Sequence, residues 1–156
     1  GTEYIIDWKV AGSPADHQMN IHVPRGIVAN SVDTTFLTVN FFNGSEQSAV
    51  EYRIKGLTEW KMMERVDKVD PYYLMIDQRW KNLSKINIRE LWESDSTLTD
   101  QTFPGTLMPR PEKSTHLWEA NIGTDWPVGR HIIEVRANDR YGRVFSAYHT
   151  MRVTSE

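Results

Sequence analysis

The sequence predicts an all-β fold: an immunoglobulin-like antiparallel β-sandwich with a long irregular insertion that carries one short helix. Apolar and polar residues alternate with a period of two along most of the chain, which is typical of strands with one face in a core and the other in water. Turn-forming residues separate these runs at near-regular spacing, as they do in β-sandwiches. The alternation fades between residues 70 and 111, which places the insertion there.

Seven alternating runs predict the strands of the sandwich. Within each run one phase is mainly apolar, and we expect that phase to face the core. In chain order the core-facing phases are Tyr4, Ile6, Trp8 and Val10; Met19, Ile21 and Val23; Leu37, Val39 and Phe41; Val50, Tyr52 and Ile54; Trp118, Ala120 and Ile122; Ile133, Val135 and Ala137; and Phe145, Ala147, His149, Met151 and Val153.

Turn chemistry marks the connections between these strands. Asn43 and Gly44 follow the third run and predict a tight hairpin, because both residue types tolerate a positive φ. Gly129 precedes the sixth run, and residues 139–142, Asp-Arg-Tyr-Gly, join the last two.

The insertion begins with a helix signal. Asp70 is a suitable N-cap, and Pro71 follows it at the first helical position. Tyr73, Ile76 and Trp80 then recur at helical spacing. The pattern predicts one short helix that ends near Asn82, followed by a loop rich in Ser, Thr, Asp, Pro and Gly.

The length of 156 residues fits a single domain over residues 2–156, with residues 70–118 as an inserted excursion. We interpret Gly1 as a scar of tag removal or as the edge of an excised piece, and the chain as a C-terminal fragment of a larger protein. A long irregular excursion in a domain is often functional or forms an interface.

Composition and motifs exclude several classes of function. The formal net charge of −3 argues against nucleic acid as the main partner, and no apolar run is long enough for a membrane-spanning helix. The chain has no cysteine, which excludes thiol nucleophiles and thiolate zinc sites. The five histidines are scattered, and the sequence has no GxSxG, SxxK or phosphate-loop motif. We therefore expect no catalytic residue, no metal site and no cofactor in this domain.

Aromatic and basic residues supply the candidate contact sites. Core packing explains Trp8 and Trp118, which lie on core-facing phases. No strand phase accounts for Trp80, Trp92 and Trp126, and we group them with Tyr72 and Tyr73 as candidate contact residues. They form either a packing interface or a solvent-facing platform on which sugar rings stack, as in a carbohydrate-binding module.

Arg110 and Lys113 are the basic candidates. Pro109 and Pro111 flank Arg110 and favour an extended backbone. The two cations either present this extended edge to an acidic partner or belong to a solvated loop.

Several segments together resemble one family over residues 4–153. The most specific is Pro-Arg-Pro-Glu-Lys-Ser-Thr-His-Leu-Trp at residues 109–118; the others are residues 13–21, 63–66, 70–73, 129–137 and 139–142. In this order they resemble the C-terminal domain of bacterial calcineurin-like phosphoesterases. Residues 80–105 depart from the family pattern, because this stretch is longer than the resemblance leads us to expect.

The resemblance implies a non-catalytic accessory domain. In that family the domain follows a metal-dependent catalytic domain with DxH, GD and GNH motifs, none of which occurs in this chain. The implied partner is the catalytic domain of the same polypeptide, on which the accessory domain packs and whose active-site rim it shapes. Divalent metals are implied for the parent enzyme only, and the implied location is an exported bacterial protein, periplasmic or at the cell surface.

Overall fold

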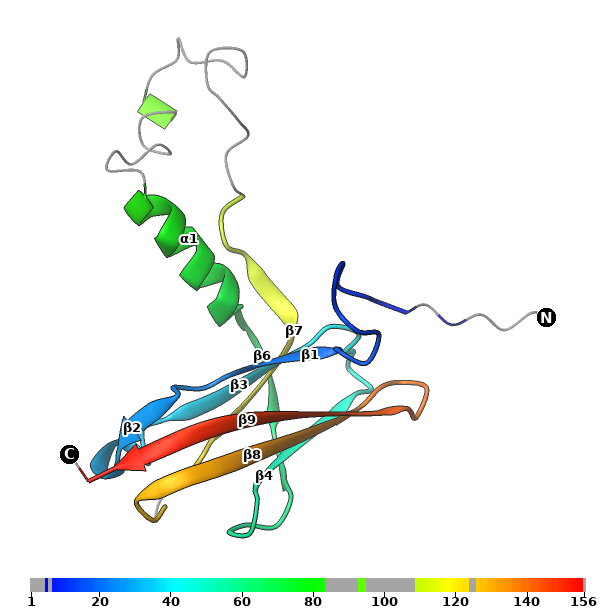
Figure 1. Cartoon of the computed structure of the whole chain (residues 1–156). Coiled ribbons are helices and arrows are strands. Elements are labelled where there is room, and N and C mark those ends of the chain that lie inside the picture. Colours follow the sequence, from blue (N-terminus) through cyan, green and yellow to red (C-terminus); the bar gives the residue numbers. More distant parts are fainter. Residues whose placement is uncertain (1–4, 6, 84–92, 95–108, 124–125, 156) are drawn as a thin grey trace. The chain divides into compact units, whose positions relative to one another are not determined.

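Two β-sheets share one core in the described part of the chain, which comprises residues 5, 7–83, 93–94, 109–123 and 126–155 (Figure 1). The strand order is β1-β3-β7-β6 in one sheet and β2-β9-β8-β4-β5 in the other. The strands are β1 (Met19–His22), β2 (Gly26–Val28), β3 (Phe36–Phe41), β4 (Ala49–Ile54), β5 (Lys61–Met62), β6 (Glu64–Val69), β7 (Lys113–Asn121), β8 (Gly129–Asn138) and β9 (Val144–Thr154). The computed structural model therefore confirms an all-β sandwich with one short α-helix, while the finer immunoglobulin-like topology stays a prediction.

Six of the seven predicted alternating runs form strands of this sandwich. Their predicted core phases meet between the sheets, where Phe41 of β3 lies 6.2 Å from the ring of Trp118 in β7 and 5.8 Å from that of Phe145 in β9. Ring pairs at such distances add to the stability that apolar burial already gives. The core is assembled from β1, β3 and β7 on one side and from β4, β8 and β9 on the other.

The described residues of the first predicted run, residue 5 and residues 7–10, form no strand. Tyr4 and Ile6 of this run lie outside the described residues. Residues 7–10 have no ladder partner, and Trp8, which was expected in the core, is 48% exposed. The prediction was wrong because the period of two reports which residues are apolar, whereas strand formation also requires a neighbouring strand for the backbone groups. Here the backbone oxygen of Trp8 accepts a hydrogen bond from the side chain of Gln18 instead (2.7 Å).

One continuous stretch supplies an edge strand to each sheet. β1 pairs antiparallel with β3, and after Pro24 the chain continues as β2, which pairs in parallel with β9. A proline cannot donate to a ladder, so the change of sheet falls at a residue that neither sheet requires as a donor. The β2–β9 pair is therefore a parallel exception within the predicted antiparallel sandwich.

The loop after β3 also differs from its prediction. β3 and β4 belong to different sheets, so residues 42–48 cross between the sheets and form no hairpin. Gly44 is required for space: a Cβ there would lie 2.4 Å from Cη2 of Trp118 and 2.8 Å from the backbone oxygen of Phe41. The glycine allows the indole of Trp118 to lie against the loop.

The turn between β8 and β9 confirms the prediction for residues 139–142. Oδ1 of Asp139 accepts hydrogen bonds from the backbone N–H groups of Tyr141 and Arg143 (both 2.9 Å), and Gly142 has φ 78°. Burial by itself would raise the pKa of Asp139, but these bonds and the Arg143 side chain outweigh it and lower the pKa. The ionised carboxylate thus organises the turn.

Residues 69–113 form a compact unit separate from the sandwich unit of residues 1–68 and 114–156. Its helix α1 spans Pro71–Leu83, as the sequence predicts. Oδ1 of Asp70 accepts hydrogen bonds from the backbone N–H of Tyr72 (2.6 Å) and of Tyr73 (3.3 Å). This is the expected N-cap, since it satisfies donors that have no partner within the helix.

Candidate functional site

Helix α1 leaves apolar side chains on its surface. Tyr72, Leu74 and Met75 are 51%, 48% and 44% exposed. Asp77 is buried on another side of the helix, where its carboxylate lies 2.8 Å from Nζ of Lys81 one turn later. The helix therefore leaves three large apolar side chains at its surface, beside exposed polar residues such as Gln78 and Arg79. Solvent-facing apolar side chains of this size favour a contact that covers them.

The segment after the loop returns to this helix. The hydroxyl of Tyr73 donates a hydrogen bond to the backbone oxygen of Pro109 (2.9 Å). Arg110 forms an ion pair and hydrogen bond with Glu93, and this carboxylate raises the pKa of Arg110. The structure thus brings Tyr73 and the segment that carries Arg110 together within one unit.

The other predicted contact residues do not lie together and differ in how exposed they are. Trp80 is half-buried in α1, Lys113 is exposed at the first position of β7, and Trp92 lies outside the described residues. Trp126 is only 7% exposed in the sandwich core, where its Nε1–H donates to the backbone oxygen of Ile122 (3.2 Å). Trp126 thus contributes to packing and cannot be part of a solvent-facing platform.

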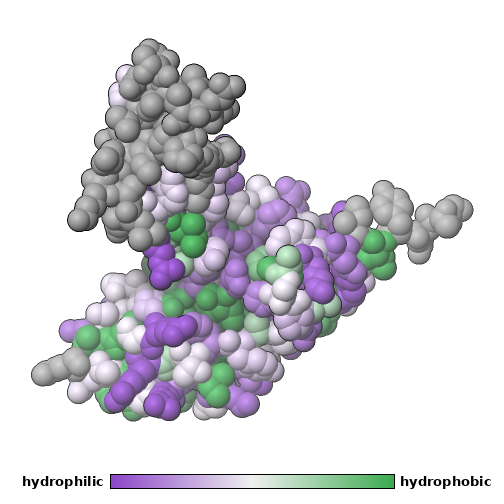
Figure 2. Space-filling view, turned by 45° about the horizontal axis from the view of Figure 1, so that its top comes forward, coloured by the Kyte–Doolittle hydropathy of each residue, from purple (hydrophilic) through white to green (hydrophobic). Residues whose placement is uncertain are grey.

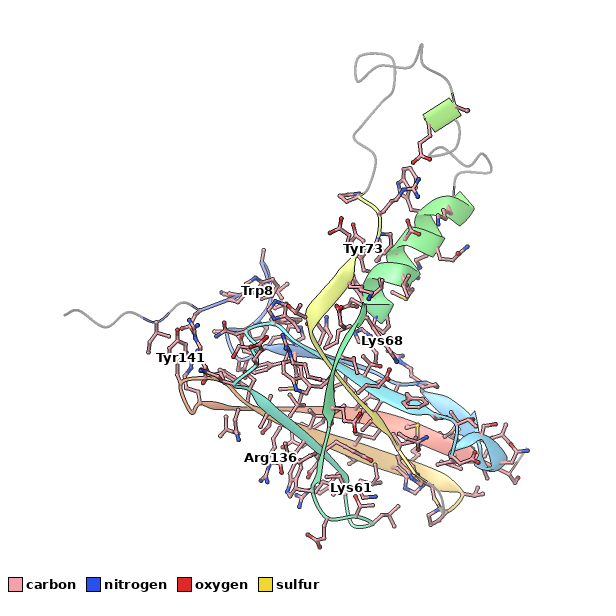
Figure 3. The ribbon with its side chains drawn as sticks, turned by 180° about the vertical axis from the view of Figure 1, so that it is seen from behind. Trp8, Lys61, Lys68, Tyr73, Arg136 and Tyr141 are labelled. Carbon is pink, nitrogen blue, oxygen red and sulfur yellow. The ribbon has the colours of Figure 1, made fainter. Side chains whose placement is uncertain are left out.

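A second set of contacts, which the sequence did not predict, fixes the N-terminal segment to the sandwich. The Trp8 ring lies 4.7 Å from that of Phe42, directly after β3. Asp7 pairs with Arg143 (2.6 Å), and Arg143 also pairs with Asp139 in the β8–β9 turn (2.7 Å). Figure 3 shows Trp8 and Tyr141 toward the same end of the sandwich, so the contacts join the incoming chain to that end.

A hollow of about 400 Å³ is lined at this end by the β3–β4 loop, β6, β7 and the β8–β9 turn. Its cationic groups are Arg65 and Arg140, and His116 contributes an imidazole. Arg65, His116 and Arg140 come from segments that are far apart in the sequence, so no local motif predicts that they lie together. The one residue of the hollow that the sequence could have indicated is His116. It precedes the buried Leu117–Trp118 pair, in the segment that most specifically resembles the family.

The outer face of the five-stranded sheet carries an ordered network of charges. The guanidinium groups of Arg53 and Arg136 lie 4.7 Å and 4.2 Å from the ring centroid of Trp60. Arg53 also pairs with Glu134, and this hydrogen bond lowers the pKa of Glu134. Figure 3 shows Arg136 on this part of the sandwich. We assign the network to the stability of the sheet, since each charge has a partner.

Among the described residues, no three His, Asp or Glu side chains are close enough to hold a metal ion. On the face shown in Figure 2, hydrophilic side chains surround small apolar groups. No helix within the described ranges has the length and apolar character of a membrane span.

Comparison with known protein families agrees with the resemblance. The family model for the C terminal of Calcineurin-like phosphoesterase matches residues 1–145, which is most of the chain. No match is found among curated proteins or among solved structures. The matched domain is the C-terminal part of these proteins and not their catalytic domain. The chain therefore belongs to the family of C-terminal domains of calcineurin-like phosphoesterases.

Proposed function

We propose that this domain packs on the catalytic domain of the same polypeptide and shapes the rim of its active site, without taking part in the chemistry. The observation that carries the proposal is the exposed apolar surface of α1, formed by Tyr72, Leu74 and Met75. Large apolar side chains left exposed on one short helix favour a partner that covers them. In a C-terminal domain of this family the nearest partner is the domain that precedes it.

The anchored N-terminal segment supports the same proposal. Trp8 and Asp7 hold this segment against the sandwich, so the proposed arrangement attaches a preceding domain at a fixed point of the sandwich. Contacts between domains of one chain are usually modest in area and fairly polar. A fixed connection reduces the entropy lost when such a contact forms.

The direct test uses the polypeptide encoded upstream, which we expect to carry DxH, GD and GNH motifs. Coexpression with the 156-residue chain should give a complex that copurifies. A triple variant of α1 (Tyr72→Ser, Leu74→Ser, Met75→Ser) should weaken this complex at least tenfold. The matched control replaces three exposed apolar residues of the five-stranded sheet: Ile132→Ser, Val144→Ser and Tyr148→Ser.

Two outcomes would contradict the proposal. In one, the α1 variant and the control variant bind the upstream domain equally well. In the other, oligosaccharides of one class quench the tryptophan fluorescence of the isolated chain in a dose-dependent way, which would favour a carbohydrate-binding module.

In the proposed arrangement the upstream domain, and not this one, binds divalent metals. The whole protein is exported from a bacterial cell to the periplasm or cell surface.

A further inference from the structure

The hollow lined by Arg65, His116 and Arg140 is open to solvent and gathers basic and hydroxyl side chains. Its volume of about 400 Å³ lies within the usual range of small-ligand sites, about 300–1,000 Å³. Ser45 and Thr115 add hydroxyl groups to its lining, and Glu46 is its only acidic residue among the described lining residues. The hollow therefore carries two permanent positive charges against one negative charge.

The three basic side chains at the hollow, Arg65, His116 and Arg140, are each held by a contact on part of their surface. Nε of Arg65 donates to the backbone oxygen of Thr115 (2.9 Å), and Nδ1 of His116 lies 2.8 Å from the backbone oxygen of Gly44. Nη2 of Arg140 donates to the hydroxyl of Tyr141 (2.6 Å), and its guanidinium lies 4.8 Å from that ring. Preorganised donors lose little entropy when a ligand binds.

The remaining donors suit a tetrahedral oxyanion. A guanidinium group offers two parallel N–H bonds to a phosphate or carboxylate. Because a carbonyl oxygen fixes the proton on Nδ1 of His116, its Nε2 is left to accept the hydrogen of a protonated phosphate, or to donate when the ring is charged. Two guanidinium groups, an imidazole and two hydroxyls offer more bonds than the two oxygens of a carboxylate require.

We propose that this hollow binds the phosphoryl group of a small phosphorylated molecule. Arg65 and Arg140 bind the phosphoryl oxygens, and His116 holds one oxygen through Nε2. Glu46 competes with the ligand, because its carboxylate lies 3.6 Å from Nη1 of Arg65 and is 86% exposed. The site is on the sandwich unit and does not depend on the packing of α1 proposed above.

The test is an NMR titration of the 156-residue chain at constant ionic strength with inorganic phosphate, methyl phosphate or acetate. Both phosphates should shift the amides of residues 45–47, 115–116 and 140 with a millimolar Kd, and acetate should bind at least tenfold more weakly. If inorganic phosphate alone binds, the site takes the free ion; if methyl phosphate binds as well or better, it takes the phosphoryl group of a larger molecule, as proposed.

Variants make the test specific. Arg65→Gln and Arg140→Gln should each raise the Kd for methyl phosphate at least fivefold, whereas Glu46→Gln should lower it about twofold to fivefold, as expected for loss of a surface ion pair. The matched control is Arg130→Gln, an exposed arginine in β8. If the Arg65→Gln variant does not fold, Arg140→Gln still tests the site, because Arg140 lies in an exposed turn where the substitution leaves the fold intact.

The proposal is overturned if 20 mM methyl phosphate, about a tenfold excess over a Kd of the expected order, causes no shifts localised to the hollow. It is also overturned if the arginine variants bind like the control, or if acetate binds as tightly as phosphate. Binding of inorganic phosphate without methyl phosphate would also overturn it, because the hollow would then not accept a monoester.

Discussion

Single residues decide the packing of the sandwich, and Gly44 is the clearest case. We expect Gly44→Ala to destabilise the fold by about 1–3 kcal/mol, the usual cost of adding a methyl group to a closely packed site. The added Cβ would meet the indole of Trp118 and the backbone of Phe41, and the backbone cannot yield cheaply. Urea unfolding followed by tryptophan fluorescence measures the change.

Gly26→Ala is the matched control for this prediction. The nearest heavy atom to a Cβ at Gly26 is the backbone oxygen of Arg152 at 3.8 Å, which is ordinary contact. Its effect should stay within about 0.5 kcal/mol, as for most surface substitutions. Equal effects of the two substitutions would show that the Trp118 contact is not what requires the glycine.

The burial of His149 makes the stability of the fold depend on pH. Burial lowers the pKa of His149 below the ordinary value of 6.5, and the charges of Arg25 and His22 lower it further. The unfolded chain therefore takes up this proton at a higher pH than the folded chain does. The resulting stability is fully present above pH 6.5 and decreases as the pH falls through 6.5 toward the folded pKa.

NMR titration of the His149 imidazole should give a midpoint below 6.5. Unfolding free energies measured between pH 5 and pH 8 should rise with pH less steeply in His149→Gln than in the wild type, whatever the variant's stability at pH 8. A midpoint at or above 6.5 would contradict the assignment.

At the residue scale, burial could be predicted where it follows the local alternation of apolar and polar residues, and could not where it depends on a residue far away in the sequence. Ile133, Val135 and Ala137 alternate in the sequence and are all buried. The sequence explains Gly44 only by the backbone conformations that a glycine can adopt. Its contact with Trp118 involves a residue 74 positions away, which no local pattern reveals. Arg65, His116 and Arg140 were likewise not linked, because only the tertiary fold brings them to one hollow.

At the scale of elements, the cap of α1 was predictable because all its parts are local. We expect Asp70→Ala to remove the bonds to the backbone of Tyr72 and Tyr73 and to destabilise the helix by about 1 kcal/mol. Amide hydrogen exchange of residues 74–80 should then be about fivefold faster. Arg79→Ala, an exposed helical position, should leave these rates nearly unchanged, and similar acceleration in both variants would argue against the cap.

Elements with both faces exposed were not predictable. β6 is largely exposed on both faces, with only Val66 and Val69 half-buried, so it has no apolar phase for the period of two to detect. β5 contains two residues, which is too short for any periodicity. By contrast, the burial of β9 alternates over its eleven residues, and the sequence predicts all of them except the two terminal ones.

At the scale of the whole molecule, the division into two units predicts that the sandwich folds without the excursion. Residues 70–112 can be replaced by a Gly/Ser linker of about eight residues, which spans about 16 Å on average. Since the core draws on none of the described residues of the unit 69–113, the shortened chain should still unfold cooperatively, with a change in tryptophan emission when the core opens.

Circular dichroism and thermal unfolding measure this outcome. A shortened chain with an equally long linker and Trp118→Ala serves as the control, because it should lose several kcal/mol of core stability. If the shortened chain itself is unfolded, the sandwich requires the excursion and the two units are one cooperative structure.

The change of sheet at Pro24 has a mechanical consequence. Because β2 runs parallel to β9, opposite forces applied upstream of β2 and downstream of β9 slide the two strands along each other and load their hydrogen bonds in shear, all at once. The same tension also reaches β1 on the other layer. A domain joined to neighbours in this way should resist stretching far better than one whose terminal strands peel apart bond by bond.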